Sequence, residues 1–241
     1  MEYFVSVDRK AYHDWQLELL VESFRSQGVQ EKLFVGVNKT LDFRYPYLDH
    51  CLNHCNIYLY DDIGRKKGFS ELNEAYQLLW LLFSKKLQSP IMVMKPHMVL
   101  RKHIENVLPE PNATAFLYAH DPFFTFDLAT EKCEEFHKSI KKTKEFCAEK
   151  WFNLGNTFIM SGLPDWFVQK VINIAEELTI SQIIKKKDVW KGTVRLAWVL
   201  ATIDLSHDID VFESPDLSSI MNDRKGTILI DYEHGLLPIF N

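Results

Sequence analysis

The order of apolar runs and amphipathic segments constrains the fold of this chain more than any other feature. Residues 3–7 form a compact apolar run rich in strand-forming side chains. Residues 14–26 carry Trp15 and Phe24 at helical spacing, and residues 33–37 form a second strand-like run. Two strands joined through a helix pair in parallel with a right-handed crossover. The opening segment therefore predicts an α/β fold.

The same alternation continues along the chain. Helices are expected at 71–85, 132–149, 164–178 and 188–203, and strands at 57–60, 91–94, 113–119, 156–160 and 227–232. No internal repeat, low-complexity stretch or linker interrupts these elements, and 241 residues suit one large domain. We therefore expect a single α/β, Rossmann-like domain over residues 1–241, with a mostly parallel central sheet flanked by helices.

The charge of the chain favours no function class by itself. The net charge is −5 and the pI about 6.0, so the bulk charge does not indicate nucleic-acid binding. A local patch can still bind phosphates. Basic clusters of this kind are more often solvated surface, and here they stand at 65–67, 85–86, 141–144 and 185–187.

The chain shows no sign of targeting. Its start lacks the basic region of a signal peptide, and no stretch approaches the ~20 apolar residues of a membrane span. We expect no membrane span and a cytoplasmic location, in the host cytoplasm if the protein is viral. Cysteines are then expected to be reduced. Cys51 and Cys55, each preceded by a histidine, look like half of a zinc site, but no distant second pair completes it.

Polar residues follow several of the predicted strands. Ligands of open α/β sheets bind at the carboxyl ends of strands, near the point where strand order reverses. Val7-Asp8 and Lys95-Pro96-His97 stand at two such ends, and His120-Asp121 follow a third strand. No Ser/His/Asp triad or Cys–His arrangement indicates nucleophilic catalysis. The residues at these strand ends are therefore candidates for ligand binding.

A series of short motifs spans residues 3–236. After Asp8 these are Asp14-Trp15-Gln16, Ser23-Phe24-Arg25 with Gly28, Asn73 with Tyr76 and Leu79, residues 90–100, Leu154-Gly155-Asn156-Thr157, the Trp-containing segment 190–201, and Asp231-Tyr232-Glu233-His234-Gly235. Their order resembles the plant hydroxyproline O-arabinosyltransferases and the related peptidyl-serine galactosyltransferases. The resemblance implies a GT-A-like domain that transfers a sugar of the arabinose, galactose or glucose class from a UDP-sugar, with retention of configuration.

Two positions depart from the pattern of that family. Its acidic-Pro-Asp motif, which holds a divalent cation, is replaced by Lys95-Pro96-His97, and its terminal histidine by Asp231, with His234 close by. A divalent cation neutralises the leaving diphosphate and prefers oxygen ligands, which a charged lysine cannot supply.

Three alternatives follow from these departures. Lys95 could face the diphosphate in place of the metal, His97 with Asp231 or His234 could form an altered metal site, or the donor site could be inactive. The first is favoured because a cation stands where the leaving charge has to be stabilised. Use of Mn²⁺ or Mg²⁺ is left open.

The resemblance assigns roles to the remaining candidates. The catalytic set is Lys95, His97 and Asn156. The donor-binding set is Val7, Asp8, Asn73, Lys95, Gly155 and His234. The acceptor-binding set is His120, Asp121 and Asn156. Each also has a structural interpretation: Asp8 as a cap, Asn73 as a helix-face hydrogen bonder, Gly155-Asn156 as a plain turn. In the resembled reaction the leaving phosphate accepts the acceptor's proton, so the protein mainly positions groups and stabilises charge.

The expected location bears on the acceptor. The resembled plant enzymes act on secreted peptides, whereas a cytoplasmic enzyme needs another acceptor. A hydroxylated or hydroxymethylated pyrimidine in the DNA of a bacteriophage, duplex or single-stranded, is the first choice, and the basic clusters would then contact phosphates. A protein hydroxyl or a glycan is the second. A catalytically inactive GT-A-like binding module is the third.

Overall fold

The computed structural model describes a set of segments that covers most of the chain. These are residues 1–7, 11–39, 51, 53–100, 113–133, 153–163, 165–185, 187–205, 209–214, 217, 219–220 and 229–231. For residues 11–14, 219–220 and 229–231 the description is limited to the backbone.

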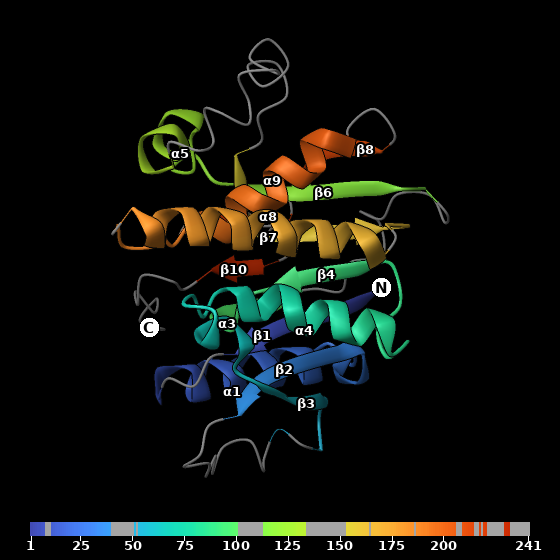
Figure 1. Ribbon diagram of the computed structural model, residues 1–241. Helices are drawn as coiled ribbons and strands as arrows, with labels where there is room; N and C mark the ends of the chain where they lie inside the picture. The colour runs from blue at the N-terminus through green and yellow to red at the C-terminus, as the bar shows by residue number, and fades with distance from the viewer. Residues whose placement is uncertain are drawn as a thin grey trace.

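A seven-stranded sheet forms the centre of the described structure (Figure 1). Its strands are β1 (Glu2–Val7), β2 (Leu33–Lys39), β3 (Asn56–Asp61), β4 (Ile91–Met94), β6 (Ala115–His120), β7 (Leu154–Ser161) and β8 (Asp210–Glu213). They lie in the order β3-β2-β1-β4-β7-β6-β8. Only β7 runs against its neighbours, and the other pairings in this sheet are parallel. The predicted, mostly parallel sheet is confirmed.

The order of the strands reverses at β1. The chain passes from β1 to β2 and β3 on one side, and then returns to place β4 on the other side of β1. Val5 accordingly pairs with Val35 in β2 and with Met94 in β4. Such a reversal leaves a crevice at the carboxyl ends of the two diverging strands, which is where α/β sheets bind ligands.

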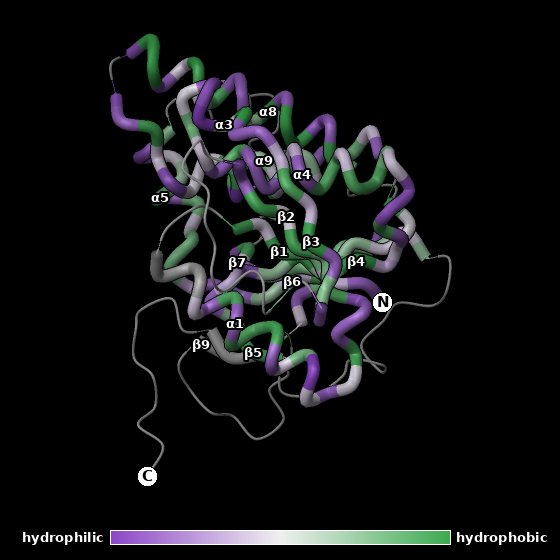
Figure 2. Tube along the Cα trace, turned by 90° about the horizontal axis from the view of Figure 1, so that it is seen from below, coloured by the Kyte–Doolittle hydropathy of each residue, from purple (hydrophilic) through white to green (hydrophobic). Residues whose placement is uncertain are grey.

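Helices and a second sheet cover the two faces of the central sheet (Figure 2). One face is covered by α4 (Leu72–Phe83), α8 (Asp165–Ile184) and α9 (Thr193–Leu205); the other by α1 (Ala11–Ser26) and a small sheet of β5 (Met98–Leu100), β10 (Leu229–Asp231) and β9 (Ser219–Ile220). The short α3 (Ile63–Lys66), α5 (Phe126–Lys132) and η1 (Gln30–Lys32) lie in the connections. None of the described helices is long and apolar enough to span a bilayer.

A hydrophobic cluster fills each side of the sheet. Trp198 of α9 is 1% exposed on the α4/α8/α9 side, and its ring centroid lies 4.7 Å from that of Phe158 and 5.9 Å from that of Phe167. On the α1 side, Tyr3 and Phe24 meet edge to face at 4.7 Å. These buried aromatic residues belong to the core on the two sides of the sheet.

Most predicted elements are present, with some changes of boundary. The helix predicted at 164–178 continues to Ile184, and the helix predicted from 188 begins at Thr193. The late start reflects a hydrogen bond from the Trp190 amide to Gln182 Oε1 at 2.8 Å, which holds residues 187–190 out of the helix. Pattern analysis did not identify the short strands β5, β8 and β9 or the short helices α3 and α5. The helix predicted at 132–149 lies mostly outside the described residues.

Candidate functional site

Several predicted site residues lie along one edge of the sheet. Val7 ends β1, Lys95 follows β4, and His120 ends β6. Because β7 is antiparallel to β4 and β6, its first residues, Asn156 among them, lie at the same edge. Asp8 and His234 lie outside the described residues. Residues from four strands therefore lie along the edge of the sheet at which a ligand is expected.

Lys95 forms an ion pair across this edge. Its Nζ contacts Glu74 Oε2, which lies in the first turn of α4. The Lys95 side chain is 28% exposed and that of Glu74 is 10% exposed. The positive end of the pair is therefore the more accessible one, and the negative end is nearly buried. A carboxylate in the first turn is also stabilised by the helix dipole.

A buried polar pair anchors the next turn of the same helix. Gln77 Nε2 donates to Asn38 Oδ1 of β2 at 2.7 Å, and both side chains are 1% exposed. Gly36 leaves the space for this contact, because a Cβ at that position would collide with the Gln77 side chain. The pair fixes α4 over the carboxyl end of β2, and so holds Glu74 over the crevice.

Asn73 lies in the same region but is bonded to its own connection. Its Oδ1 accepts from the Gly64 amide at 2.8 Å, and its Nδ2 donates to Asp62 Oδ1 at 2.8 Å. Asp62 in turn accepts from the Arg65 amide as the N-cap of α3. Asn73 is 1% exposed. These bonds match the structural interpretation of Asn73, and its proposed contact with the donor stays a prediction.

The two residues proposed as an altered metal site are close in the backbone. His97 lies two residues after Lys95. The next residue, Met98 of β5, pairs with Asp231 of β10. The Thr157 hydroxyl donates to the Met98 sulfur at 2.8 Å, so β5 is also tied to β7. The side chain of Asp231 is not among those described.

The described side chains do not supply a set of ligands for a divalent cation. No group of three or more His, Cys, Asp or Glu side chains comes together in that part of the chain. Glu74 of α4, whose carboxylate reaches Lys95 after β4, pairs with the ammonium group of that lysine. A charged ammonium cannot itself be a metal ligand.

Asp121 belongs to a tight cluster at the far end of the same edge. Its Oδ2 lies 2.5 Å from Arg195 Nη2, and its Oδ1 accepts from the Phe123 amide at 2.9 Å. Arg195 Nε also donates to the Leu154 carbonyl at 3.1 Å, and the guanidinium carbon lies 4.4 Å from the centre of the Phe124 ring. Asp121 is thus the link between β6, β7 and α9.

The other acceptor candidates are more open. His120 Nδ1 lies 3.2 Å from Glu213 Oε2, and both side chains are more than a third exposed. Asn156 is half-buried at the start of β7. The neighbouring Gly155 is buried, and a Cβ there would lie 2.7 Å from the Ala119 carbonyl oxygen. The glycine thus allows β7 to approach β6 at the irregularity between Tyr118 and His120.

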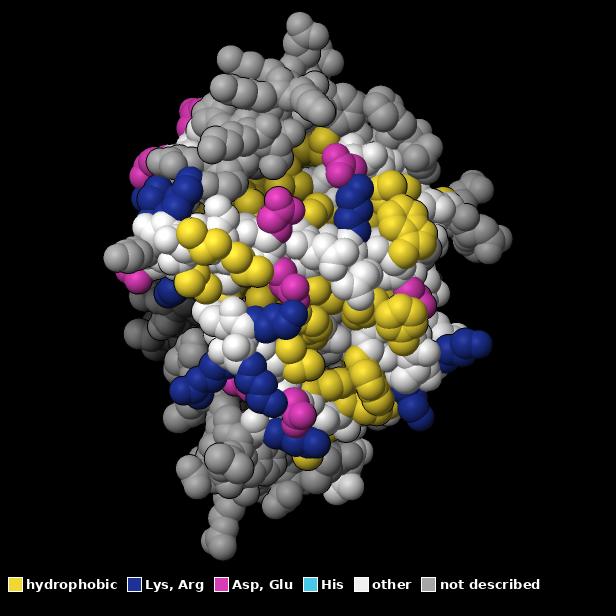
Figure 3. Space-filling view, in the orientation of Figure 1, with side chains coloured by type: hydrophobic (Ala, Val, Ile, Leu, Met, Phe, Trp, Pro, Cys, Tyr) yellow, Lys and Arg dark blue, Asp and Glu magenta, His cyan; other side chains and the backbone are white. Residues whose placement is uncertain are grey.

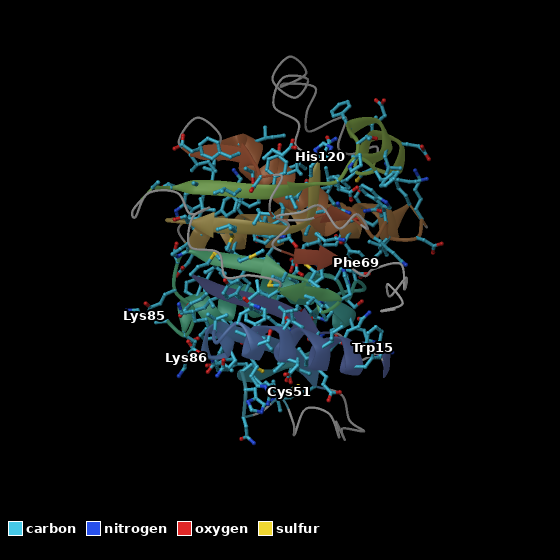
Figure 4. The ribbon with its side chains drawn as sticks, turned by 180° about the vertical axis from the view of Figure 1, so that it is seen from behind. Trp15, Cys51, Phe69, Lys85, Lys86 and His120 are labelled. Carbon is cyan, nitrogen blue, oxygen red and sulfur yellow. The ribbon has the colours of Figure 1, made fainter. Side chains whose placement is uncertain are left out.

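The basic clusters at 65–67 and 85–86 lie at opposite ends of the described structure, and the cluster at 141–144 lies outside the described residues. Figure 4 labels Lys85 and Lys86 at the end opposite to Trp15 and Phe69. Lys67 of the cluster at 65–67 pairs with Glu176 of α8 at 2.7 Å.

Sequence analysis missed two residues of this edge, Glu74 and Arg195. Glu74 follows Asn73 on a helix with an apolar face, and its 8% exposure is unusually low for a glutamate. For both Glu74 and Arg195, the sequence signal was a single charged residue on the apolar side of a helical pattern.

Comparison with solved structures identifies the fold. The chain shares its fold with the WbbM bifunctional glycosyltransferase in its apo form, at 13% identity and a TM-score of 0.54 over 97% of this chain and 45% of that one. It therefore spans less than half of the WbbM chain. It also matches the galactosyltransferase LgtC in complex with donor and acceptor sugar analogues, at 8% identity and a TM-score of 0.58 over 96% of this chain and 87% of that one.

An active-site variant of LgtC gives a similar match, at 7% identity and a TM-score of 0.57 over 96% of this chain and 87% of that one. No protein-family model matches the chain, and no curated sequence does either. The protein accordingly has the GT-A fold of glycosyltransferases, with a central sheet of mostly parallel strands flanked by helices.

Proposed function

We propose that this protein is a glycosyltransferase that takes its sugar from a UDP-sugar bound at the carboxyl ends of β1 and β4. The observation that carries the proposal is the position of Lys95. It places an ammonium group at the strand-order reversal of a fold shared with LgtC, a protein seen with donor and acceptor sugar analogues. An ammonium there would stabilise the leaving diphosphate as a point charge.

The proposed reaction breaks the bond between the sugar C1 and the diphosphate oxygen and forms a bond between C1 and the acceptor oxygen. The acceptor's proton passes to the leaving phosphate, so no protein base is required, and configuration is retained. Asn156 would contact the transferred sugar, while Val7, Asp8 and His234 would hold the nucleotide. The sugar is of the arabinose, galactose or glucose class.

A thermal-shift panel tests this proposal. Nucleotides and nucleotide sugars are added singly in EDTA and in Mn²⁺, because a ligand that binds only the folded state raises the midpoint by mass action. We expect a UDP-sugar to stabilise the protein in EDTA and Lys95→Ala to abolish the shift. Stabilisation that requires Mn²⁺ would favour His97 and Asp231 as a metal site. No stabilisation by any nucleotide would contradict the proposal.

For the acceptor we propose a hydroxylated or hydroxymethylated pyrimidine in DNA. Two basic clusters that are far apart in sequence lie together: Lys67 pairs with Glu176, and Gly68 adjoins Ile183, shortly before Lys185. On the face shown in Figure 3, Lys and Arg side chains are interspersed with acidic and hydrophobic ones. DNA binding that weakens steeply with salt would support this acceptor, whereas transfer to a protein hydroxyl or glycan should depend little on salt.

A second candidate function is a GT-A-like binding module without transferase activity. It is favoured by the Lys95–Glu74 pair, since the family's acidic motif is absent and the lysine is already partly neutralised. A protein that binds a nucleotide sugar but neither transfers nor hydrolyses it, with or without Mn²⁺, would establish this alternative.

A further inference from the structure

The Lys95–Glu74 pair has a consequence for ligand affinity. A lone lysine beside a diphosphate would contribute a full positive charge. Here Glu74, only 8% exposed, brings a negative charge into contact with that lysine. An anion that enters the site is therefore attracted by Lys95 and repelled by the nearby Glu74. Its net electrostatic energy is the difference between these two interactions.

The helix that carries Glu74 is fixed in place. One turn further on, Gln77 is bonded to Asn38, and both of these side chains are buried. The backbone of α4 at Glu74 is therefore held beside the crevice. Lys95, at 28% exposure, is the more accessible member and keeps N–H groups for a second acceptor, because an ammonium has three donors and a single contact to Glu74 engages one.

We propose that Glu74 limits the affinity of the Lys95 site for diphosphate. The inference rests on the proposed function, in which Lys95 faces the diphosphate of a UDP-sugar. Glu74 holds the ammonium at the end of β4 and at the same time repels the negative ligand. In many enzymes product release limits turnover. A counter-ion built into the site would thus help the nucleoside diphosphate product to leave.

The size of the effect follows from Coulomb's law. We take a distance of about 6 Å between the Glu74 charge and a phosphate, and an effective dielectric constant of about 40. Removing that negative charge then tightens binding roughly tenfold for each unit of ligand charge at this distance. Glu74→Gln keeps the size of the side chain and removes its charge. We expect this variant to bind UDP about tenfold more tightly than the wild type, with a smaller gain for UMP, which lacks the second phosphate.

The experiment is a calorimetric titration of UDP and UMP in EDTA at low salt. The variants are Glu74→Gln, the double variant Glu74→Gln/Lys95→Ala, and Asp204→Asn as a control. Asp204 pairs with Lys170 at 2.8 Å, away from the β4 end, so this control removes a carboxylate from a different lysine pair. The double variant removes both charges and leaves no buried carboxylate without its partner.

Tighter UDP binding by Glu74→Gln supports the inference, and a gain in affinity cannot result from misfolding. The double variant should bind UDP more weakly than the wild type, and Asp204→Asn should match the wild type. Unchanged or weaker UDP binding by Glu74→Gln overturns the inference while the wild type still binds. If the wild type binds neither nucleotide, the proposed function fails instead.

Discussion

Asp121 offers the sharpest test of whether a predicted site residue is structural. Asp121→Ala removes the carboxylate that pairs with Arg195 and accepts from the Phe123 amide. Breaking a fully buried pair costs about 3 to 5 kcal/mol. The Arg195 and Asp121 side chains are 24% and 13% exposed, so solvent reduces this to about 2 to 3 kcal/mol.

Urea unfolding followed by circular dichroism measures that loss through linear extrapolation. The matched control is Glu213→Ala, since its pair with His120 on the same edge is exposed and should contribute less than about 1 kcal/mol. A double-mutant cycle of Asp121→Ala with Arg195→Ala should show coupling of about 1 to 2 kcal/mol. A loss of stability below about 0.5 kcal/mol would refute a structural role for Asp121. Its predicted role in binding the acceptor would then be favoured again.

Three further predictions concern buried groups. Asn73→Ala should lower the free energy of unfolding by about 2 kcal/mol, measured by urea titration, because the buried Gly64 amide loses its partner; a neutral effect would be inconsistent with the hydrogen bonds observed. Gly155→Ala should cost about 1 to 3 kcal/mol in the same assay, since the new methyl would meet the Ala119 carbonyl. Burial raises the pKa of Cys55 to about 12, so its thiol stays protonated at pH 8.5. Iodoacetamide, followed by peptide mass spectrometry, should then label it more than 100-fold more slowly than in urea, and equal rates would contradict this.

The fold was largely predictable because its main signals are local. Strands such as 91–94 are continuous apolar runs, and helices such as 71–85 carry a clear apolar face. The alternation of the two types already implies parallel pairing. Short strands such as β8 escape this reasoning, since its four residues include Asp210 and Glu213 and gain their strand geometry from pairing with β6.

The places of the candidate residues in the fold could be predicted from the sequence, but their contacts could not. Strand ends placed Lys95 and His120 at one edge, because parallel strands share their carboxyl ends. The partners of these residues come from elements distant in sequence, as Glu74 is for Lys95. Which side of α4 carries a buried charge depends on the packing of the helix over β1 and β2, and a single sequence does not encode that contact locally.

The most direct test of the central claim is release of UDP from UDP-sugars by the purified protein in EDTA. UDP-arabinose, UDP-galactose and UDP-glucose are incubated singly, with and without hydroxymethylated DNA, and free UDP is followed by chromatography. The proposed function predicts slow release from one of these donors, faster release with the acceptor, and loss of both in Lys95→Ala. No release from any donor, in EDTA or in Mn²⁺, would contradict a sugar-transferring site at the end of β4.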